Sequence, residues 1–448
     1  MSVLDAVLVV TALLLAVGGA VVPRTARWAA PVLLPLLFAG AGIQLLLDDF
    51  VWQRVPAYAL LAVATWLLLR TPRRTVPAAL LVGALVPVAT AVWALPPVPR
   101  LPPPDGAYPV GSTVLRWVDE SRPEAATADP GDHRNIVVQA WYPAEFDSAP
   151  RQYLYLDGHG ELPATVAGMP SALLSRYHLI DTHAGADVPL ADDRPRWPVL
   201  LFSPGHGAPR AVYTGLLTEL ASRGFVVLAV DHPYEVAVTE LADGTVAHGV
   251  PNSGSDAEMA AQLAVRTADL SAVLDRIGTV DSPLTGRIDT TRVAAAGHSL
   301  GGATAASASA HDQRVVAAAN IDGTLYGDLP EQRLPGPYLL IDSDPARTGH
   351  SAAYLERNRK LLGGVQGGGH HYTIGRTDHI GCTDAPLFLA PPVRALAGRW
   401  FGGERSPVET RRATADLLAA VLGPPLGERP ADVAAVAGRY PDVAGGPV

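Results

Sequence analysis

The segment Gly297-His298-Ser299-Leu300-Gly301 carries the clearest chemical pattern in the chain. It matches G-x-S-x-G, in which a sharp turn between a strand and a helix lifts a serine hydroxyl clear of a sheet. The glycines are needed because a side chain at either position would clash with the neighbouring strand or helix. An apolar run, Val293–Ala296, precedes the segment, and a run of small residues, Gly302–Ala310, follows it. The pattern predicts that Ser299 is a nucleophile.

A serine hydroxyl is a weak nucleophile and needs a histidine base that is itself oriented by an acid. Along chains with this motif the order is serine, acid, histidine, so the base should follow Ser299. His379 lies in the loop after a candidate strand, Tyr372–Ile374, where such a base belongs, and it is the preferred residue. His370 and His371 directly precede that strand and are expected in a solvated loop.

The acid has two candidate positions when only spacing is considered. Asp322 follows the candidate strand Val315–Ile321, whereas Asp342 and Asp344 follow the next apolar run, Tyr338–Ile341. Either strand end can bring a carboxylate to the edge of the sheet where the histidine is expected. The residues themselves therefore leave the choice of acid open.

Acyl transfer also needs two backbone N–H groups that stabilise the developing oxyanion. One is expected from Leu300, the residue after the nucleophile. The other is expected from the glycine-rich segment Ser203-Pro204-Gly205-His206-Gly207, which follows the third candidate strand and can turn sharply. We expect the backbone N–H of His206 to be this second donor.

No metal or cofactor is expected at this site. The pair His370-His371 with His379 could suggest metal ligands, but a zinc site usually needs three or four, and His379 is already assigned to the base. His350 comes too early in the chain and is expected at the surface. Cys382 is the only cysteine, which excludes an intrachain disulfide and a cysteine-based zinc site. Neither a P-loop nor a dinucleotide fingerprint follows a strand.

Short β-branched runs alternate with Ala- and Leu-rich stretches after the first hundred residues. This alternation predicts an α/β-hydrolase fold, with a mostly parallel eight-stranded sheet covered by helices on both faces. The candidate strands are Thr113–Val118, Asn135–Trp141, Pro198–Ser203, Phe225–Asp231, Arg292–Ala296, Val315–Ile321, Tyr338–Asp342 and Tyr372–Ile374. The candidate helices are Tyr213–Arg223, Ser255–Ile277, Ala303–Ala310 and Ala352–Leu362, with one more, Val408–Leu422, in the tail.

Four apolar stretches open the chain, and an α-helix of about 20 apolar residues can cross a bilayer core of about 30 Å. They predict an all-α transmembrane module over residues 1–97, in which the third stretch is short. A proline-rich linker is expected over 98–112, the catalytic domain over 113–402 and a helical extension over 403–448. The apolar stretches are Val3–Val22, Ala29–Leu47, Val55–Leu69 and Val76–Leu95.

Loop charges predict how such a module would be oriented. Arginines concentrate in the first and third loops, and the positive-inside rule places these loops in the cytoplasm. The catalytic domain would then lie on the extracellular side of a multi-pass cell-membrane protein. The charges are Arg24 and Arg27 in the first loop, Asp48, Asp49 and Arg54 in the second, and Arg70, Arg73 and Arg74 in the third.

Charge argues against nucleic acid as a partner. The first 100 residues contain three acidic residues and seven arginines, so the rest of the chain has a net charge of −13. Nucleic acids and anionic lipid surfaces attract basic patches. An acidic catalytic domain is therefore not expected to bind nucleic acid or anionic lipid surfaces, and its expected partner is an ester substrate of lipid character.

The large domain resembles the platelet-activating factor acetylhydrolases of the secreted type and their actinobacterial relatives, near the polyester-hydrolase and cutinase branch. The resemblance covers about Tyr108 to Leu387 and rests on short segments in a fixed order. These are Tyr108-Pro109-Val110-Gly111, Val137-Val138-Gln139-Ala140-Trp141-Tyr142-Pro143, Phe202-Ser203-Pro204-Gly205-His206-Gly207, Val230-Asp231-His232-Pro233, Gly297-His298-Ser299-Leu300-Gly301-Gly302, Asn320-Ile321-Asp322-Gly323 and Thr377-Asp378-His379.

The resemblance implies that the acid is Asp322, because in that family the acid follows the sixth strand. It also implies ester hydrolysis through an acyl-serine intermediate, without a cofactor, on phospholipids with a short or oxidised sn-2 chain. Pro204 and His206 depart from the residues commonly found in the family's oxyanion loop. Two alternatives stay open: a broader carboxylesterase, polyester hydrolase or acyltransferase, and a membrane receptor or scaffold that kept the fold without the activity.

Overall fold

The computed structural model describes most of the chain, in two compact units. The described residues are 3–21, 23–47, 51–69, 75–95, 98–145, 156–158, 161–166, 169–174, 176–398 and 400–448. One unit comprises Met1–Pro99 with Phe388–Val393, and the other comprises Arg100–Leu387 with Arg394–Val448. Each unit has its own buried apolar core.

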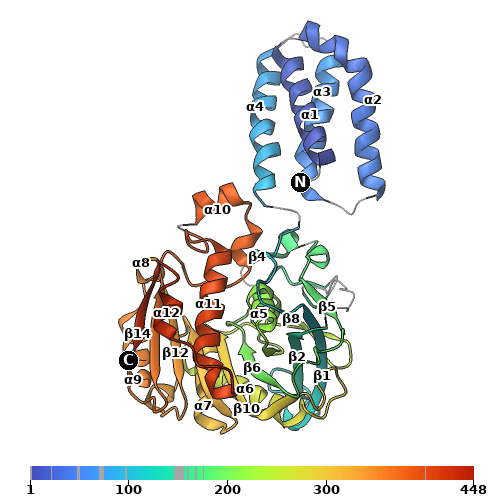
Figure 1. The fold of residues 1–448 in the computed structure, drawn as a ribbon. Helices are drawn as coiled ribbons and strands as arrows, with labels where there is room; N and C mark the ends of the chain where they lie inside the picture. The colour runs from blue at the N-terminus through green and yellow to red at the C-terminus, as the bar shows by residue number, and fades with distance from the viewer. Residues whose placement is uncertain are drawn as a thin grey trace. The chain divides into compact units, whose positions relative to one another are not determined.

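Within the described residues of its first hundred, the chain forms four α-helices, which Figure 1 shows packed together in blue. They are α1 (Val3–Val21), α2 (Pro23–Leu47), α3 (Val55–Leu69) and α4 (Thr75–Ala91). Helix α1 contacts the other three, and the core is made of small and aliphatic side chains such as Ala12, Leu60 and Ala64. Short 3-10 turns lie at Trp52–Arg54 and Val92–Ala94.

The prediction that these helices cross a membrane is not supported. Among the residues that the structure describes, none of the helices has both the length and the apolar character that a membrane span requires. Helix α3 has 15 residues and α4 has 17, fewer than the roughly 20 that a bilayer core of about 30 Å requires. Part of the predicted linker and several charges used to orient the module lie outside the described residues: Asp48, Asp49, Arg70, Arg73, Arg74, Pro96 and Pro97.

The second unit is built on a ten-stranded sheet with the order β14-β13-β12-β11-β10-β6-β7-β2-β1-β5. The six strands β13, β12, β11, β10, β6 and β7 pair in parallel, whereas β2, β1 and β14 join antiparallel. The strands are β1 (Val110–Pro123), β2 (His133–Pro143), β5 (Ala184–Ala186), β6 (Trp197–Ser203), β7 (Val226–Asp231), β10 (Ile288–His298), β11 (Val315–Ile321), β12 (Tyr338–Ser343), β13 (Gly369–Ile374) and β14 (Val443–Pro447).

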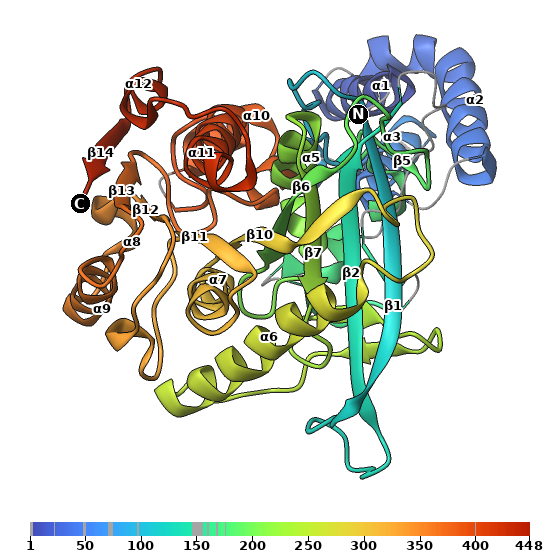
Figure 2. The same ribbon diagram turned by 60° about the horizontal axis from the view of Figure 1, so that its bottom comes forward.

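Helices cover both faces of this sheet, as the view along it in Figure 2 shows. On one face, α5 (Thr214–Ser222), α11 (Pro407–Leu422) and α12 (Val433–Ala437) share a core with the strands. On the other face, α6 (Asp256–Arg276), α7 (Leu300–His311) and α9 (Ala352–Leu362) do the same. Smaller elements are α8 (Pro345–Thr348), α10 (Pro391–Ala397) and two hairpins, β3 (Thr165–Val166) with β4 (Met169–Pro170) and β8 (Val238–Glu240) with β9 (Val246–His248).

The sheet differs from the prediction at its two edges. Eight strands were expected, and the two additional ones, β5 and β14, are short and consist largely of Ala, Gly and Pro. Such residues lack the β-branched pattern that identifies a strand in a sequence. The tail, expected as an extension, contributes Leu417 and Leu418 of α11 to the core and pairs β14 with β13.

The strand order indicates where on the sheet the functional region lies. Strand β6 connects to β7 on one side, while β10 lies on its other side, so the order of the sheet reverses at β6. In open parallel sheets, ligands bind beyond the carboxyl ends of the strands at such a reversal. The chain segments that leave β6, β10, β11 and β13 therefore converge at one edge.

Candidate active site

Ser299 occupies a strained turn between β10 and α7. Its backbone has φ 55° and ψ −126°, a combination that costs energy for a residue with a side chain and that is found mainly at functional sites. The flanking glycines are required by crowding: a Cβ on Gly297 would lie 2.6 Å from the carbonyl oxygen of Ser203, and one on Gly301 would overlap that same oxygen. The turn thus matches the predicted elbow.

Three predicted residues meet beside this turn. The Nε2 atom of His379 lies 3.1 Å from Oγ of Ser299, and its Nδ1 atom lies 2.7 Å from Oδ2 of Asp322. Asp322 directly follows β11, and His379 lies in the loop after β13. An ionised carboxylate can only accept, so Nδ1 of His379 carries the proton and Nε2 is free to accept from the serine hydroxyl. This is the tautomer that a general base requires.

Asp322 is almost fully buried, with 2% of its side chain exposed. Its carboxylate accepts several hydrogen bonds. Oδ1 accepts from the backbone N–H of Ser343 at 2.9 Å and from Nε2 of His350 at 2.8 Å, and Oδ2 accepts from the Ser343 hydroxyl at 2.9 Å. Burial alone would raise the pKa of Asp322, but the hydrogen bonds from His350, His379 and Ser343 outweigh it and hold the pKa well below its ordinary value. The carboxylate is therefore ionised in the working range of pH.

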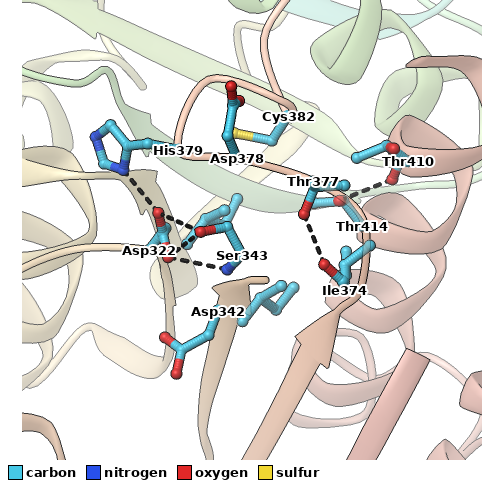
Figure 3. Close-up of a pocket in the computed structure, with 12 residues that line it drawn as sticks. Asp322, Asp342, Ser343, Ile374, Thr377, Asp378, His379, Cys382, Thr410 and Thr414 are labelled. Atoms are coloured by element: carbon cyan, nitrogen blue, oxygen red, sulfur yellow. Dashed lines mark hydrogen bonds and ion pairs between the residues drawn. The ribbon is translucent and has the colours of Figure 1, made fainter. Parts of the chain in front are cut away.

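The two alternative acids have other partners. Asp342 accepts from the hydroxyl of Tyr354 and lies 2.8 Å from Nε2 of His371, and Figure 3 shows its carboxylate pointing away from His379. Asp344 caps α8 by accepting from the backbone N–H of Ala346 at 3.0 Å. Neither carboxylate contacts the candidate base.

Two expectations about histidines are wrong. His350 is not at the surface: only 5% of its side chain is exposed, because Gly349 in the left-handed conformation (φ 63°) turns the chain back toward Asp322. His370 and His371 do not precede the last parallel strand in a loop but belong to it, paired with Leu339 and Leu340 of β12.

The glycine-rich segment after β6 forms a loop beside Ser299. Arg266 of α6, which is fully buried, donates to the carbonyl oxygens of Pro204 at 2.6 Å and Gly205 at 3.3 Å. Its guanidinium is held in turn by the carboxylate of Glu235. Leu300 is the first residue of α7, so its N–H has no acceptor within the helix. Leu300 and His206 can thus present N–H groups near Ser299.

His298, the variable residue before the nucleophile, links the glycine-rich loop after β6 to the loop that contains His379. Its Nδ1 atom lies 2.8 Å from the hydroxyl of Tyr213, and its Nε2 atom lies 2.7 Å from the carbonyl oxygen of His379. The Tyr213 hydroxyl also accepts from the backbone N–H of Gly205 at 3.0 Å. A chain of hydrogen bonds therefore joins the glycine-rich loop to the backbone of the candidate base.

A second serine, histidine and aspartate lie in line behind the glycine-rich loop. Nε2 of His232 is 2.9 Å from Oγ of Ser203, and Nδ1 is 2.8 Å from Oδ2 of Asp269. All three side chains are fully buried, so no substrate can reach this serine. Burial and the nearby Arg266 lower the pKa of His232, which keeps it neutral. The arrangement supports the loop and is not a second active site.

A pocket of about 300 Å³ opens at Ser299. This volume is at the lower end of the range for small-molecule sites. Its walls are mostly small or apolar, and the histidines are the only titratable side chains apart from Tyr213. The lining residues are Gly205, His206, Ala208, Val212, Tyr213, His298, Ser299, His379, Ile380, Thr383, Ala385 and Phe401.

A small cavity of about 20 Å³ lies beside Asp322, and Figure 3 shows its lining. Cys382, the only cysteine of the chain, lines it together with Asp378 and Thr377. Burial raises the pKa of the Cys382 thiol, so the thiol stays protonated and unreactive.

One group of side chains in the described part of the chain has the spacing of metal ligands. Asp322, Asp342 and His350 each offer an atom within 4.8 Å of the others. Both carboxylates, however, already accept hydrogen bonds from protein donors, namely the histidines, Tyr354 and Ser343. These bonds satisfy the carboxylates, and we assign no metal here.

Sequence reasoning missed three residues of this site. His298 could have been noticed because it occupies a position inside the motif. Arg266 could also have been noticed, since it falls on the apolar face of α6 with Leu263 and Leu270, where an arginine must be paired. His350 carries no such signal, because only the fold-back at Gly349 brings it to Asp322.

The fold and the arrangement of Ser299, His379 and Asp322 are those of a serine hydrolase of the α/β-hydrolase class. A family model described as platelet-activating factor acetylhydrolase, isoform II, matches residues 100–252, and one described as PET hydrolase-like matches residues 196–324. Over these residues the chain is similar to the platelet-activating factor acetylhydrolases, in agreement with the resemblance seen in the sequence.

Individual relatives agree with this placement. A probable 1-alkyl-2-acetylglycerophosphocholine esterase of Arthroderma benhamiae is 27% identical over 53% of this chain and 64% of its own length, slightly under two thirds. A platelet-activating factor acetylhydrolase of Cavia porcellus is 26% identical over 60% of this chain and 68% of its own length. The solved ferulic acid esterase from Streptomyces cinnamoneus superposes with a TM-score of 0.65 and 28% identity, over 78% of this chain and 99% of that one. Each of these proteins is named as an esterase or an acetylhydrolase.

Proposed function

We propose that this chain hydrolyses carboxylic esters with Ser299 as nucleophile, His379 as general base and Asp322 as the acid that orients His379. The observation that supports the proposal most directly is the contact of the two ring nitrogens of His379, at 3.1 Å from Ser299 and 2.7 Å from Asp322. The strained backbone of Ser299 also supports the proposal.

In the proposed mechanism, Oγ of Ser299 attacks the ester carbonyl carbon while its proton moves to Nε2 of His379. The carbonyl oxygen becomes an oxyanion, which accepts from the backbone N–H groups of Leu300 and His206. The C–O bond to the alcohol then breaks, and His379 returns the proton to the leaving oxygen. Water, deprotonated by His379, attacks the acyl-serine, and the collapse of the second intermediate releases the acid and restores the serine.

The proposed substrate is a phospholipid with a short or oxidised acyl chain. The names of the relatives from Arthroderma benhamiae and Cavia porcellus support this class. A pocket of about 300 Å³ with apolar walls would suit a short acyl group better than a long one.

A broader carboxylesterase or polyester hydrolase is the second candidate. The match to a PET hydrolase-like family and the likeness to a ferulic acid esterase favour it. Rates on p-nitrophenyl esters with acyl chains of two to sixteen carbons separate the two. A sharp optimum at two to four carbons supports the first candidate, and a flat profile supports the second.

The central test is the variant Ser299→Ala. We expect it to lose at least about a thousandfold of the kcat on p-nitrophenyl acetate, because no other group can form the acyl-enzyme. The neighbouring variant Ser307→Ala, on α7, should retain wild-type activity and serves as the control. Activity of Ser299→Ala close to that of the wild type would rule the mechanism out.

We also propose that the first unit attaches the chain to a membrane, with the hydrolase outside the cell. Large apolar side chains are exposed on its helices, including Leu14, Trp28, Leu36 and Leu69, and such surfaces are typical of membrane or protein contacts. The full chain should sediment with membranes after carbonate washing, and external protease should cleave the hydrolase unit in intact cells. Recovery of the chain in the soluble fraction would contradict the attachment.

A further inference from the structure

Asp322 is shared by two histidines. His379 contacts Oδ2 at 2.7 Å, and Nε2 of His350 contacts Oδ1 at 2.8 Å. His350 follows the short helix α8 and precedes α9, far from the motif that holds Ser299. Nothing in the sequence pairs it with the candidate acid, and the proposed mechanism above does not use it.

The direction of this second hydrogen bond is fixed. The carboxylate of Asp322 is ionised and can only accept, so Nε2 of His350 donates whether the ring is neutral or protonated. The hydrogen bond that His350 donates to Asp322 is also what raises the pKa of His350. The imidazole lies flat against the ring of Tyr354, with centroids 4.1 Å apart and planes at 9°. Tyr354 itself is anchored on Asp342.

The contact bears on how the Asp322 carboxylate is oriented. The terminal torsion of an aspartate side chain is broad, with two nearly equivalent settings, so the carboxylate plane must be held by donors. On Oδ1 these donors are His350, the backbone N–H of Ser343 and the Ser343 hydroxyl, which Oδ1 shares with Oδ2. Together they leave Oδ2 directed at Nδ1 of His379. Without His350, only Ser343 and His379 itself would hold the carboxylate, and its plane would be less firmly fixed.

We infer that His350 is a positioning residue for catalysis, which holds the carboxylate of Asp322 in the plane that His379 needs. The inference rests on the proposed function, because it assigns His350 a part in the work of the same serine, histidine and aspartate. His350 does not touch the substrate or the reacting atoms. Its effect is transmitted through Asp322 alone.

The test compares variants that keep or remove the donor. His350→Leu removes it, and His350→Gln keeps an N–H of similar reach. Because hydrogen bonds to charged groups are among the stronger ones, we expect kcat of His350→Leu on p-nitrophenyl acetate to fall about tenfold to a hundredfold, with KM within about twofold. His350→Gln should recover most of the loss.

His371 offers a matched control. It contacts Asp342 at 2.8 Å in the same way that His350 contacts Asp322, but it does not reach the candidate acid. His371→Leu should therefore keep the wild-type kcat. If His350→Leu does not give folded protein by circular dichroism, His350→Asn, whose shorter amide does not reach Asp322, replaces it.

The outcomes separate this inference from the proposed function. A folded His350→Leu with wild-type kcat, a failure of His350→Gln to recover activity, or an equal loss in His371→Leu would overturn the positioning role. Ser299→Ala is measured in the same series. If Ser299→Ala stays active, the proposed function fails, whatever the His350 variants do.

Discussion

His298 stabilises the candidate active site and takes no part in the proposed reaction steps. Burial lowers its pKa to about 3, so the ring is neutral. Because its Nε2 atom contacts a carbonyl oxygen, that of His379, Nε2 carries the proton and Nδ1 accepts from the hydroxyl of Tyr213. The ring also packs against that of His379, with centroids 4.5 Å apart. One buried imidazole thus fixes both the backbone and the ring of the candidate base.

The neutral state of His298 has a consequence for stability. In the unfolded chain a histidine titrates near pH 6.5, whereas His298 in the folded chain titrates near 3. Between these values the unfolded state binds more protons, so stability decreases as the pH falls. The buried His232, whose pKa is also lowered, adds to the effect. Each group contributes a slope of up to about 1.4 kcal/mol per pH unit.

We therefore expect urea denaturation to give a markedly lower free energy of unfolding at pH 5 than at pH 7. His298→Gln should flatten this dependence, and the exposed His248→Gln should leave it as in the wild type. Equal free energies of unfolding at the two values of pH would contradict the assignment of a buried, neutral His298.

At the level of single residues, the sequence predicts a functional residue where the motif fixes the order of the catalytic residues along the chain. Ser299 and His379 could be predicted because the motif and its order along the chain restrict them. The choice of Asp322 over Asp342 and Asp344 needed the family resemblance, since spacing alone did not separate strand ends that lie side by side. His350 could not be predicted, because its place depends on a single left-handed turn at Gly349.

Among the elements, the loop after β6 depends on α6. A trans peptide is planar, and its C=O and N–H point in opposite directions. By holding the carbonyl oxygen of Gly205, Arg266 turns the N–H of His206 to the opposite side of the loop. Glu235 completes this support, because it binds Arg266 and also lies 3.2 Å from Nδ1 of His206.

Removing the guanidinium should misalign this N–H group. We expect Arg266→Gln to reduce kcat by about tenfold to a hundredfold, somewhat less than the loss of a whole oxyanion donor, with a small change in KM. It should weaken binding of a boronic-acid transition-state analogue by a similar factor. Arg276→Gln, at an exposed position on the same helix, is the control. A folded Arg266→Gln with unchanged analogue affinity would show that the loop does not need α6.

The central strands could be predicted from their apolar, β-branched runs, and six of them form the parallel part of the sheet. The edge strands β5 and β14 could not, because three to five small residues form a strand only when a neighbour supplies the hydrogen bonds. The same tertiary effect draws His370 and His371 into β13. Helix α11 could be predicted as a helix but not as a part of the core.

At the scale of the whole molecule, the topology explains why distant residues meet. The reversal of strand order at β6 and the parallel strands β10, β11 and β13 bring residues as far apart in the chain as Ser203 and His379 to one edge of the sheet.

Apolar composition, by contrast, does not determine what the first unit does. Four apolar stretches predicted four spans, yet the helices they form are packed on one another, and two of them are short for a bilayer.

Covalent labelling of the wild-type protein is the sharpest test of Ser299 as the nucleophile. A fluorophosphonate reacts only with a serine that is activated by a neighbouring base and held beside an oxyanion site. We expect one adduct per chain, located by peptide mass spectrometry on the peptide that contains Ser299 and absent from Ser299→Ala. An adduct on another serine, or no adduct in a folded protein that still hydrolyses esters, would contradict it.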